Sequence, residues 1–140
     1  MRDHIAPRGL VAGLLLSALL AGGAAAEGAR LMLDCAFVTS CLGGGACEAA
    51  EGAVRFAIAP METDAEGAGD YTVIVDRGQA MPARALSRIG PFSWSPGPGR
   101  LHALSLTGED SALWLRQITD SGTGAPPSAE IEILHCEVTQ

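Results

Sequence analysis

The chain has 140 residues, with nine basic side chains against sixteen acidic ones and a formal net charge of −7 at pH 7. This length favours one domain with a hydrophobic core of its own rather than two. The acidic balance excludes binding to nucleic acid or to an anionic membrane surface through bulk electrostatic attraction.

Residues 1–26 have the features of a secretory signal peptide. Two arginines precede an apolar stretch over residues 10–20, and a run of alanines at residues 24–26 provides the small side chains that a signal peptidase needs. Cleavage there leaves residues 27–140 as a single β domain with a formal net charge of −8 (7 − 15). We therefore expect a periplasmic or secreted protein with no stable membrane anchor, and the alternative is an uncleaved anchor over residues 10–26.

From residue 31 onward, apolar and polar residues alternate in short runs, as they do in strands with one buried face. Clusters of Gly, Pro, Asp and Ser separate these runs. The pattern predicts an all-β fold, a small antiparallel meander of about seven or eight strands that is closed as a barrel or folded as a sandwich. The predicted strands cover residues 31–37, 54–58, 71–75, 92–95, 101–106, 111–119 and 131–138, and the second run stops at Pro60. Residues 79–90 fit either a strand interrupted at Pro82 or one short helical turn.

All four cysteines lie downstream of the signal, at positions 35, 41, 47 and 136. By strand alternation, Cys35 in the first predicted strand and Cys136 in the last both face the core, and these two strands are neighbours in a closed meander. Cys41 and Cys47 are separated by a glycine-rich loop that allows the chain to turn back. Of the three possible connectivities we therefore favour Cys35–Cys136 with Cys41–Cys47. Neither pair has the Cys-x-x-Cys spacing that thiol oxidoreductases use, so both bridges are predicted to be structural.

No cluster of residues in the sequence has the spacing of a metal site or a catalytic centre. His102 and His135 lack zinc-ligand spacing, and the acidic stretch at residues 64–70 fits a hairpin loop better than a calcium loop. The Gly-x-Ser-x-Gly motif of many serine hydrolases is absent, which argues against that class, and an enzyme would need a cleft in which titratable side chains converge. We expect no metal, no cofactor and no enzymatic activity.

Glu130 and Glu132 alternate with Ile131 and Ile133 near the end of the chain. Paired carboxylates can perform acid–base chemistry, but alternating glutamates are typical of the solvent-exposed face of a strand. We therefore expect both glutamates to face solvent.

Two tryptophans and two arginines in the second half of the chain form a candidate partner surface. Trp94, Arg100, Trp114 and Arg116 fall on three consecutive predicted strands or their turns. If the leucines that flank Trp114 are in the core, Trp114 is exposed beside Arg116 and can contact a protein or a sugar ring. If Trp114 is in the core instead, Arg116 lies at the edge of the core and this surface does not exist.

Three functions stay open on the sequence alone. The first is a monomeric, non-enzymatic binding or structural module of the cell envelope whose partner is an envelope protein or a glycan. The second is a barrel-type carrier of a small apolar ligand, which requires eight or more strands and an open cavity and fails if the interior is filled. The size, the export signal and the disulfide-closed barrel are also similar to those of small periplasmic lysozyme inhibitors. That likeness implies an inhibitor of an envelope hydrolase, although the Ser- and Lys-bearing loop motifs of those inhibitors are absent.

Overall fold

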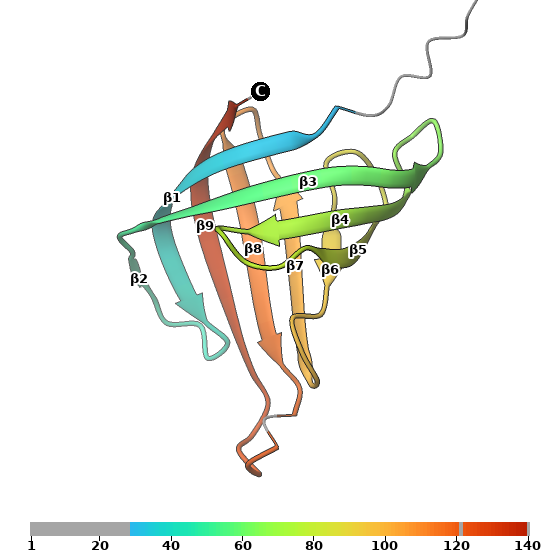
Figure 1. The fold of residues 1–140 in the computed structure, drawn as a ribbon. Helices are drawn as coiled ribbons and strands as arrows, with labels where there is room; N and C mark the ends of the chain where they lie inside the picture. The colour runs from blue at the N-terminus through green and yellow to red at the C-terminus, as the bar shows by residue number, and fades with distance from the viewer. Residues whose placement is uncertain (1–28, 121, 140) are drawn as a thin grey trace, which may run out of the picture.

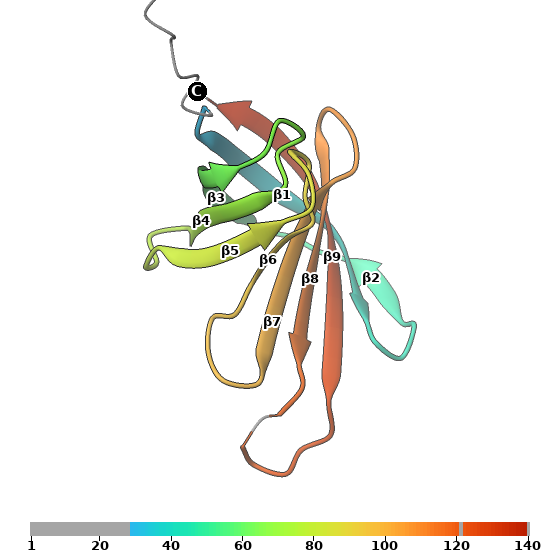
Figure 2. The ribbon, with the colours of Figure 1, turned by 90° about the vertical axis from the view of Figure 1, so that its right-hand side faces the viewer.

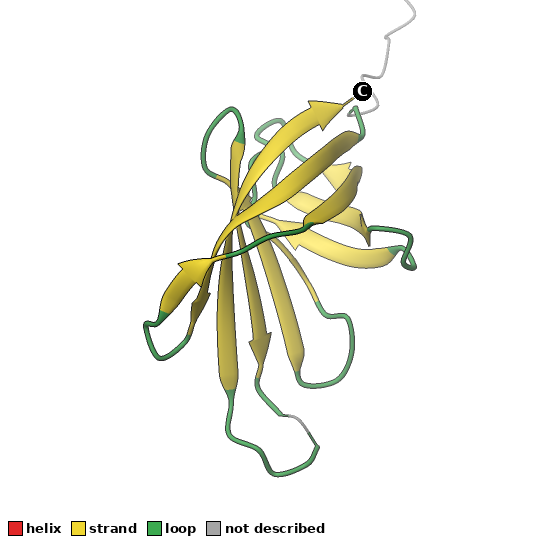
Figure 3. Ribbon diagram, turned by 90° about the vertical axis from the view of Figure 1, so that its left-hand side faces the viewer, coloured by secondary structure: helices red, strands yellow, loops and turns green. Residues whose placement is uncertain are grey.

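A computed structural model describes residues 29–120 and 122–139, and every regular element in these ranges is a β-strand (Figures 1 and 3). This confirms the predicted all-β fold, while the predicted signal peptide at residues 1–26 lies outside the described residues. In the described ranges no helix is long and apolar enough to cross a membrane. The strands are β1 (Leu31–Leu42), β2 (Cys47–Ala49), β3 (Ala53–Thr63), β4 (Gly69–Val75), β5 (Met81–Ala85), β6 (Phe92–Trp94), β7 (Arg100–Leu106), β8 (Ser111–Ile118) and β9 (Ser128–Thr139).

The strands form a closed antiparallel barrel. Neighbours follow chain order from β3 to β9, β1 lies beside β3, and pairing of β1 with β9 closes the ring. Eight strands make up the barrel, and β2 is an additional strand on one side of β1. Of the two architectures that the sequence left open, the chain therefore adopts the barrel.

One neighbour of β1 changes part-way along the strand. The first half of β1 pairs with β3 and its second half pairs with β2, while β9 lies along both halves on the other side. A register shift at Val38 separates the halves, and this residue bulges outward. Strands β7, β8 and β9 extend beyond β3, β4 and β5 at one end (Figure 2). We call this the lower end, which holds the β6–β7 turn and the β8–β9 loop; the upper end holds the β3–β4 turn (Figure 1).

Both predicted disulfides are present. Cys35 and Cys136 are direct partners in the β1–β9 ladder, and Cys41 and Cys47 are partners in the β1–β2 ladder. The first bridge joins the first and last strands of the barrel, and the second ties the β1–β2 hairpin. Two disulfides are compatible with an oxidising, exported environment.

Side chains from every barrel strand fill the middle of the barrel. Phe56 is fully buried and packs edge-on against both tryptophans, with its ring centroid 6.4 Å from that of Trp94 and 5.2 Å from that of Trp114. The middle of the barrel is therefore a packed core rather than a channel. The buried apolar residues are Leu33, Cys35, Val54, Phe56, Ile58, Tyr71, Val73, Ala83, Ala85, Phe92, Trp94, Leu104, Ala112, Trp114, Leu134 and Cys136.

Two local features differ from the prediction made from the sequence. The predicted end of a strand at Pro60 is wrong, since β3 continues to Thr63 after a register shift at Met61. The short strand β2 was not predicted at all. Within residues 79–90 a strand forms rather than a helical turn, and Pro82 is tolerated because β6 pairs with β5 only from Ala83 onward.

Candidate functional site

The predicted partner surface does not exist, because its tryptophans lie inside the barrel. Trp94 and Trp114 are only 2% and 6% exposed. Strand β8 turns Trp114 inward and leaves Leu113 and Leu115 partly exposed on the outside, which is the second of the two alternatives weighed from the sequence. Arg100 is exposed at the start of β7. The expected exposed Trp–Arg surface is therefore wrong.

Arg116 contacts Trp114 and two carboxylates at the lower end of the barrel. Its guanidinium carbon lies 4.8 Å from the Trp114 ring centroid. Its Nη2 is 2.7 Å from Oε2 of Glu130 and also donates to Oε1 of Glu132. The hydroxyl of Ser40 donates to Oε1 of Glu130 over 3.1 Å. This network joins β1, β8 and β9 and places charged side chains across the lower end.

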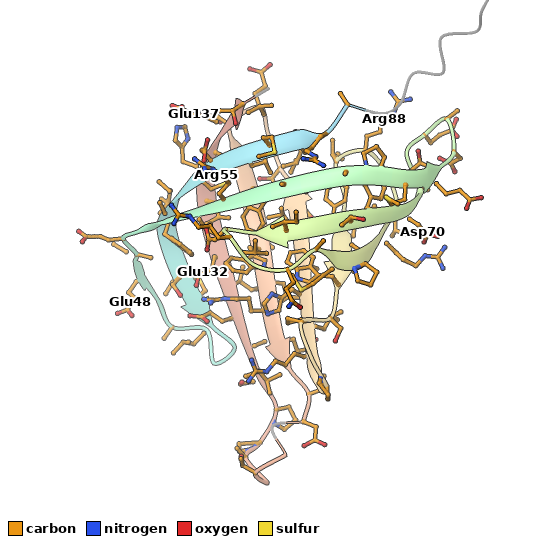
Figure 4. All side chains as sticks on the ribbon, in the orientation of Figure 1. Glu48, Arg55, Asp70, Arg88, Glu132 and Glu137 are labelled. Carbon is orange, nitrogen blue, oxygen red and sulfur yellow. A yellow bond between two sulfur atoms is a disulfide. The ribbon has the colours of Figure 1, made fainter. Side chains whose placement is uncertain are left out.

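Glu132 is buried, which contradicts the prediction that both glutamates face solvent. Its exposure is 3%, whereas the neighbouring Ile133 is 43% exposed on the outer face, and Glu130 is partly buried. The alternation that turns Leu134 into the core also turns Glu132 inward, and Arg116 compensates the buried charge. The labelled side chain of Glu132 lies in the lower half of the barrel (Figure 4).

The buried side-chain polar atoms that have no hydrogen-bond partner among the described residues all belong to this region. The His102 ring lies between the two tryptophan rings, with centroids 5.5 Å from each. Each such atom costs about 1–3 kcal/mol when it is buried without a hydrogen-bond partner. The lower end is therefore the part of the described interior in which polar atoms lack hydrogen bonds. The five atoms are Trp94 Nε1, His102 Nδ1, Trp114 Nε1, Arg116 Nε and Glu132 Oε2.

His102 and His135 lie on opposite faces of the sheet. Burial lowers the pKa of His102, and the positive charges of Arg116 and Arg100 lower it further, so its imidazole is neutral at pH 7. His135 is exposed on the outer face of β9, 3.5 Å from Asp110. In the described part of the chain no group of three or more His, Cys, Asp or Glu side chains could hold a metal ion.

A cavity of about 660 Å³ lies at the upper end, in the mouth of the barrel. The inward-facing side chains that line this mouth cavity come from five strands: Leu31, Ile58, Tyr71, Phe92 and Leu106. Ile58, Tyr71 and Phe92 are buried, so the floor of the cavity is the top of the hydrophobic core. Pockets for small molecules typically have volumes of roughly 300–1,000 Å³, and barrel mouths are among their preferred places.

A second hollow, of about 670 Å³, lies on the outer wall of the barrel. Outward-facing side chains of several strands border it, including Met61, Pro82 and Arg84, and all three are exposed. The outer hollow is therefore a groove in the surface of the sheet. Tyr71 and Trp94 also border the outer hollow, but the mouth cavity is the more enclosed of the two and has buried Ile58, Tyr71 and Phe92 as its floor, so it is the better candidate for a ligand.

Two turns form the rim of the mouth cavity. The Tyr71 hydroxyl donates to the carbonyl oxygen of Gly67 in the β3–β4 turn over 2.7 Å. Arg88 reaches the same turn from the β5–β6 connection, because its Nη2 donates to the carbonyl oxygen of Ala65 and its backbone N–H donates to that of Glu66. Burial raises the pKa of Tyr71, so its phenol stays protonated as a donor at neutral pH. The predicted hairpin loop within residues 64–70 is confirmed, and it serves as one wall of the rim.

The sequence did not reveal the mouth cavity. Its lining comes from strands that are far apart along the chain, and Arg88 lies in the stretch over residues 79–90 whose structure the sequence left open. One signal was available: Leu31, Ile58 and Leu106 stand at the upper ends of rows of alternating apolar residues, and such positions face the mouth of a closed barrel.

Comparisons with known proteins assign no relative to this chain. No family model, no curated protein and no solved structure matches it. The function of the chain is therefore inferred from its own geometry.

Proposed function

We propose that the protein is an exported, non-enzymatic module that binds a small apolar ligand in the mouth of its barrel. The observation that carries this proposal is the mouth cavity of about 660 Å³, whose floor is the hydrophobic core. A barrel of about eight strands is just wide enough to be filled by side chains or to hold one small ligand. The filled middle excludes a carrier that encloses its ligand deep inside the barrel, and the hollow upper end supports a ligand that sits in the mouth.

The mouth cavity supports a ligand carrier better than a partner-binding surface. The Trp–Arg surface considered from the sequence would need the rings of Trp94 and Trp114 outside, and both are buried. Apolar surface that leaves water contributes roughly 25 cal/mol per Å², and Leu31, Phe92 and Leu106 offer apolar walls for that purpose. We place the protein in the periplasm or outside the cell, where its disulfides are stable.

Titration with an uncharged fluorescent probe, Nile red, tests the proposal. The variant Leu106→Trp fills part of the mouth and should weaken binding at least about tenfold, because it removes space for the apolar body of the probe. The matched control Ile133→Trp adds the same ring on the exposed outer face of β9 and should bind as the native protein does. Circular dichroism and thermal unfolding verify that both variants fold. Absence of Nile red binding to the native protein, or equal binding by Leu106→Trp, would contradict the proposal.

A further inference from the structure

Arg88 is a cation at the edge of an apolar cavity. It lines the mouth cavity together with Leu31, Phe92 and Leu106, and its side chain is at the upper end of the molecule beside the β3–β4 turn (Figure 4). Among the described residues, Arg88 forms no ion pair, whereas Arg116 at the lower end contacts two carboxylates. A guanidinium has five N–H donors, and the hydrogen bond to the carbonyl oxygen of Ala65 uses one of them.

The backbone of the β3–β4 turn holds Arg88 in this place. Gly67 has a φ of +84°, and a Cβ atom built on it would lie 2.2 Å from Cγ of Arg88 and 2.8 Å from its backbone nitrogen. Only glycine therefore leaves room for the aliphatic stem of Arg88 against the turn. Arg88 as a whole is exposed, but its packed stem and its bonded N–H keep the guanidinium beside the turn, so part of the ordering cost of binding is already met.

The carboxylate that shares the rim is already engaged. Oδ1 of Asp64 accepts hydrogen bonds from the backbone N–H groups of Glu66 over 3.0 Å and Ala68 over 2.8 Å, which closes the turn. Asp64 keeps its negative charge, but these two hydrogen bonds hold its Oδ1 on the backbone of the turn, and Arg88 is the one cation among the described residues that line the cavity. A guanidinium held beside an apolar wall suits a ligand with an anionic head, such as a carboxylate or a phosphate.

We propose that the ligand of the mouth cavity is an amphipathic anion, with its apolar body against Leu31, Phe92 and Leu106 and its head at the Arg88 guanidinium. This inference rests on the proposed function and adds the chemical class of the ligand. The chain carries a net charge of −7, which repels anions at long range. Preference for an anionic head must therefore come from a local contact, and Arg88 supplies it.

Three probes with the same ten-carbon body and different heads test this inference: decanoate, decanol and decylamine. Each is titrated into the protein below its aggregation concentration and detected by displacement of Nile red. The native protein should bind decanoate about tenfold more tightly than decanol and should bind decylamine most weakly, as expected for a charge-assisted contact. Arg88→Gln should remove the preference for decanoate over decanol, which is measured as the ratio of the two affinities in the same variant. The matched control Arg84→Gln, on the exposed outer wall of β5, should keep the preference.

A second variant distinguishes the effect of losing the positive charge from the effect of disturbing the structure of the rim. Arg88→Lys keeps the positive charge and should retain a preference for decanoate, even if the turn that Arg88 contacts is loosened. Equal binding of decanoate and decanol by the native protein, or an unchanged preference in Arg88→Gln, would overturn the anionic class and leave the mouth site standing. Preference for decylamine would overturn it as well. If neither Nile red nor any of the three probes binds the native protein, the proposed function itself fails.

Discussion

At the lower end of the barrel, two side chains form an ion pair that is partly inside the core. Glu132 is a buried carboxylate, and Arg116 is the cation in contact with it. A buried ion pair contributes little net stability compared with an apolar pair of similar volume, but loss of one partner leaves an uncompensated charge. Arg116 is therefore more important for retaining Glu132 inside than for adding stability of its own.

The variant Arg116→Met removes the positive charge and keeps an apolar stem beside Trp114. It should lower the free energy of unfolding by about 3–5 kcal/mol, because Glu132 loses its charged partner. The double variant Arg116→Met/Glu132→Leu removes both charges and should recover most of that loss. Urea unfolding at pH 7 measures both effects, and Arg84→Met on the outer wall should stay within about 0.5 kcal/mol of the native protein. A double variant no more stable than the single one would show that the ion pair is not the cause.

His102 should make the barrel sensitive to acid. Burial lowers its pKa in the folded protein, whereas the unfolded chain has the ordinary histidine pKa of about 6.5. The unfolded state therefore takes up the proton first, so the stability contributed by neutral His102 is present above about pH 6.5 and is lost progressively as the pH falls from there through the lower pKa of the folded protein.

His102→Gln should accordingly lose less stability than the native protein between about pH 7.5 and pH 5.5. The matched control is His135→Gln, which changes an exposed histidine on the outer face of β9 and should follow the native protein. Urea unfolding at the two pH values gives the comparison. Equal losses in the native protein and in His102→Gln would assign the acid sensitivity to other groups.

At the scale of the strands, period-two alternation predicted most of the fold. It placed Cys35 and Cys136 on facing inward rows, and the disulfide between them confirms that reasoning. The same alternation, continued two positions from Leu134, places Glu132 inside. We predicted Glu132 on the solvent-exposed face because glutamates usually lie there. That prediction was wrong, because the sequence does not show which cation on a neighbouring strand will pair with Glu132.

Features that depend on register could not be predicted in this way. The bulge at Val38 turns both Phe37 and Ser40 toward the interior, although they are three positions apart on one strand. Period-two alternation cannot reveal such a shift from β1 alone, because it depends on the pairing with β9. The mouth cavity could not be predicted for the same reason. Its lining side chains, such as Leu31 and Leu106, come together only when the arrangement of five strands is known.

At the scale of the whole molecule, the two disulfides differ in the length of chain that they close. Cys35 and Cys136 are 101 positions apart, and Cys41 and Cys47 are six apart. In the chain-entropy model the long bridge restricts the unfolded state by about 4–5 kcal/mol and the short one by roughly half of that. The long bridge also joins the strands that close the barrel.

Replacement of both cysteines of one bridge by serine should show this difference. The variant without Cys35–Cys136 should lose about 4–5 kcal/mol and be close to unfolding, and the variant without Cys41–Cys47 should lose roughly half as much. Chemical unfolding of the oxidised proteins measures the free energies. A larger loss in the variant without Cys41–Cys47 would contradict the entropic account.

Barrel closure also has a consequence for how copies of the protein meet one another. Among the described strands, β2 alone has a neighbour on only one side, and it is three residues long. An open strand edge is a template on which fibrils and strand-exchanged polymers grow. Here that edge carries the charged Glu48, and the Cys41–Cys47 bridge ties it to β1. The disulfides that stabilise the fold thus also leave the described strands with almost no open edge on which another copy could pair. We therefore expect little polymerisation even at high protein concentration.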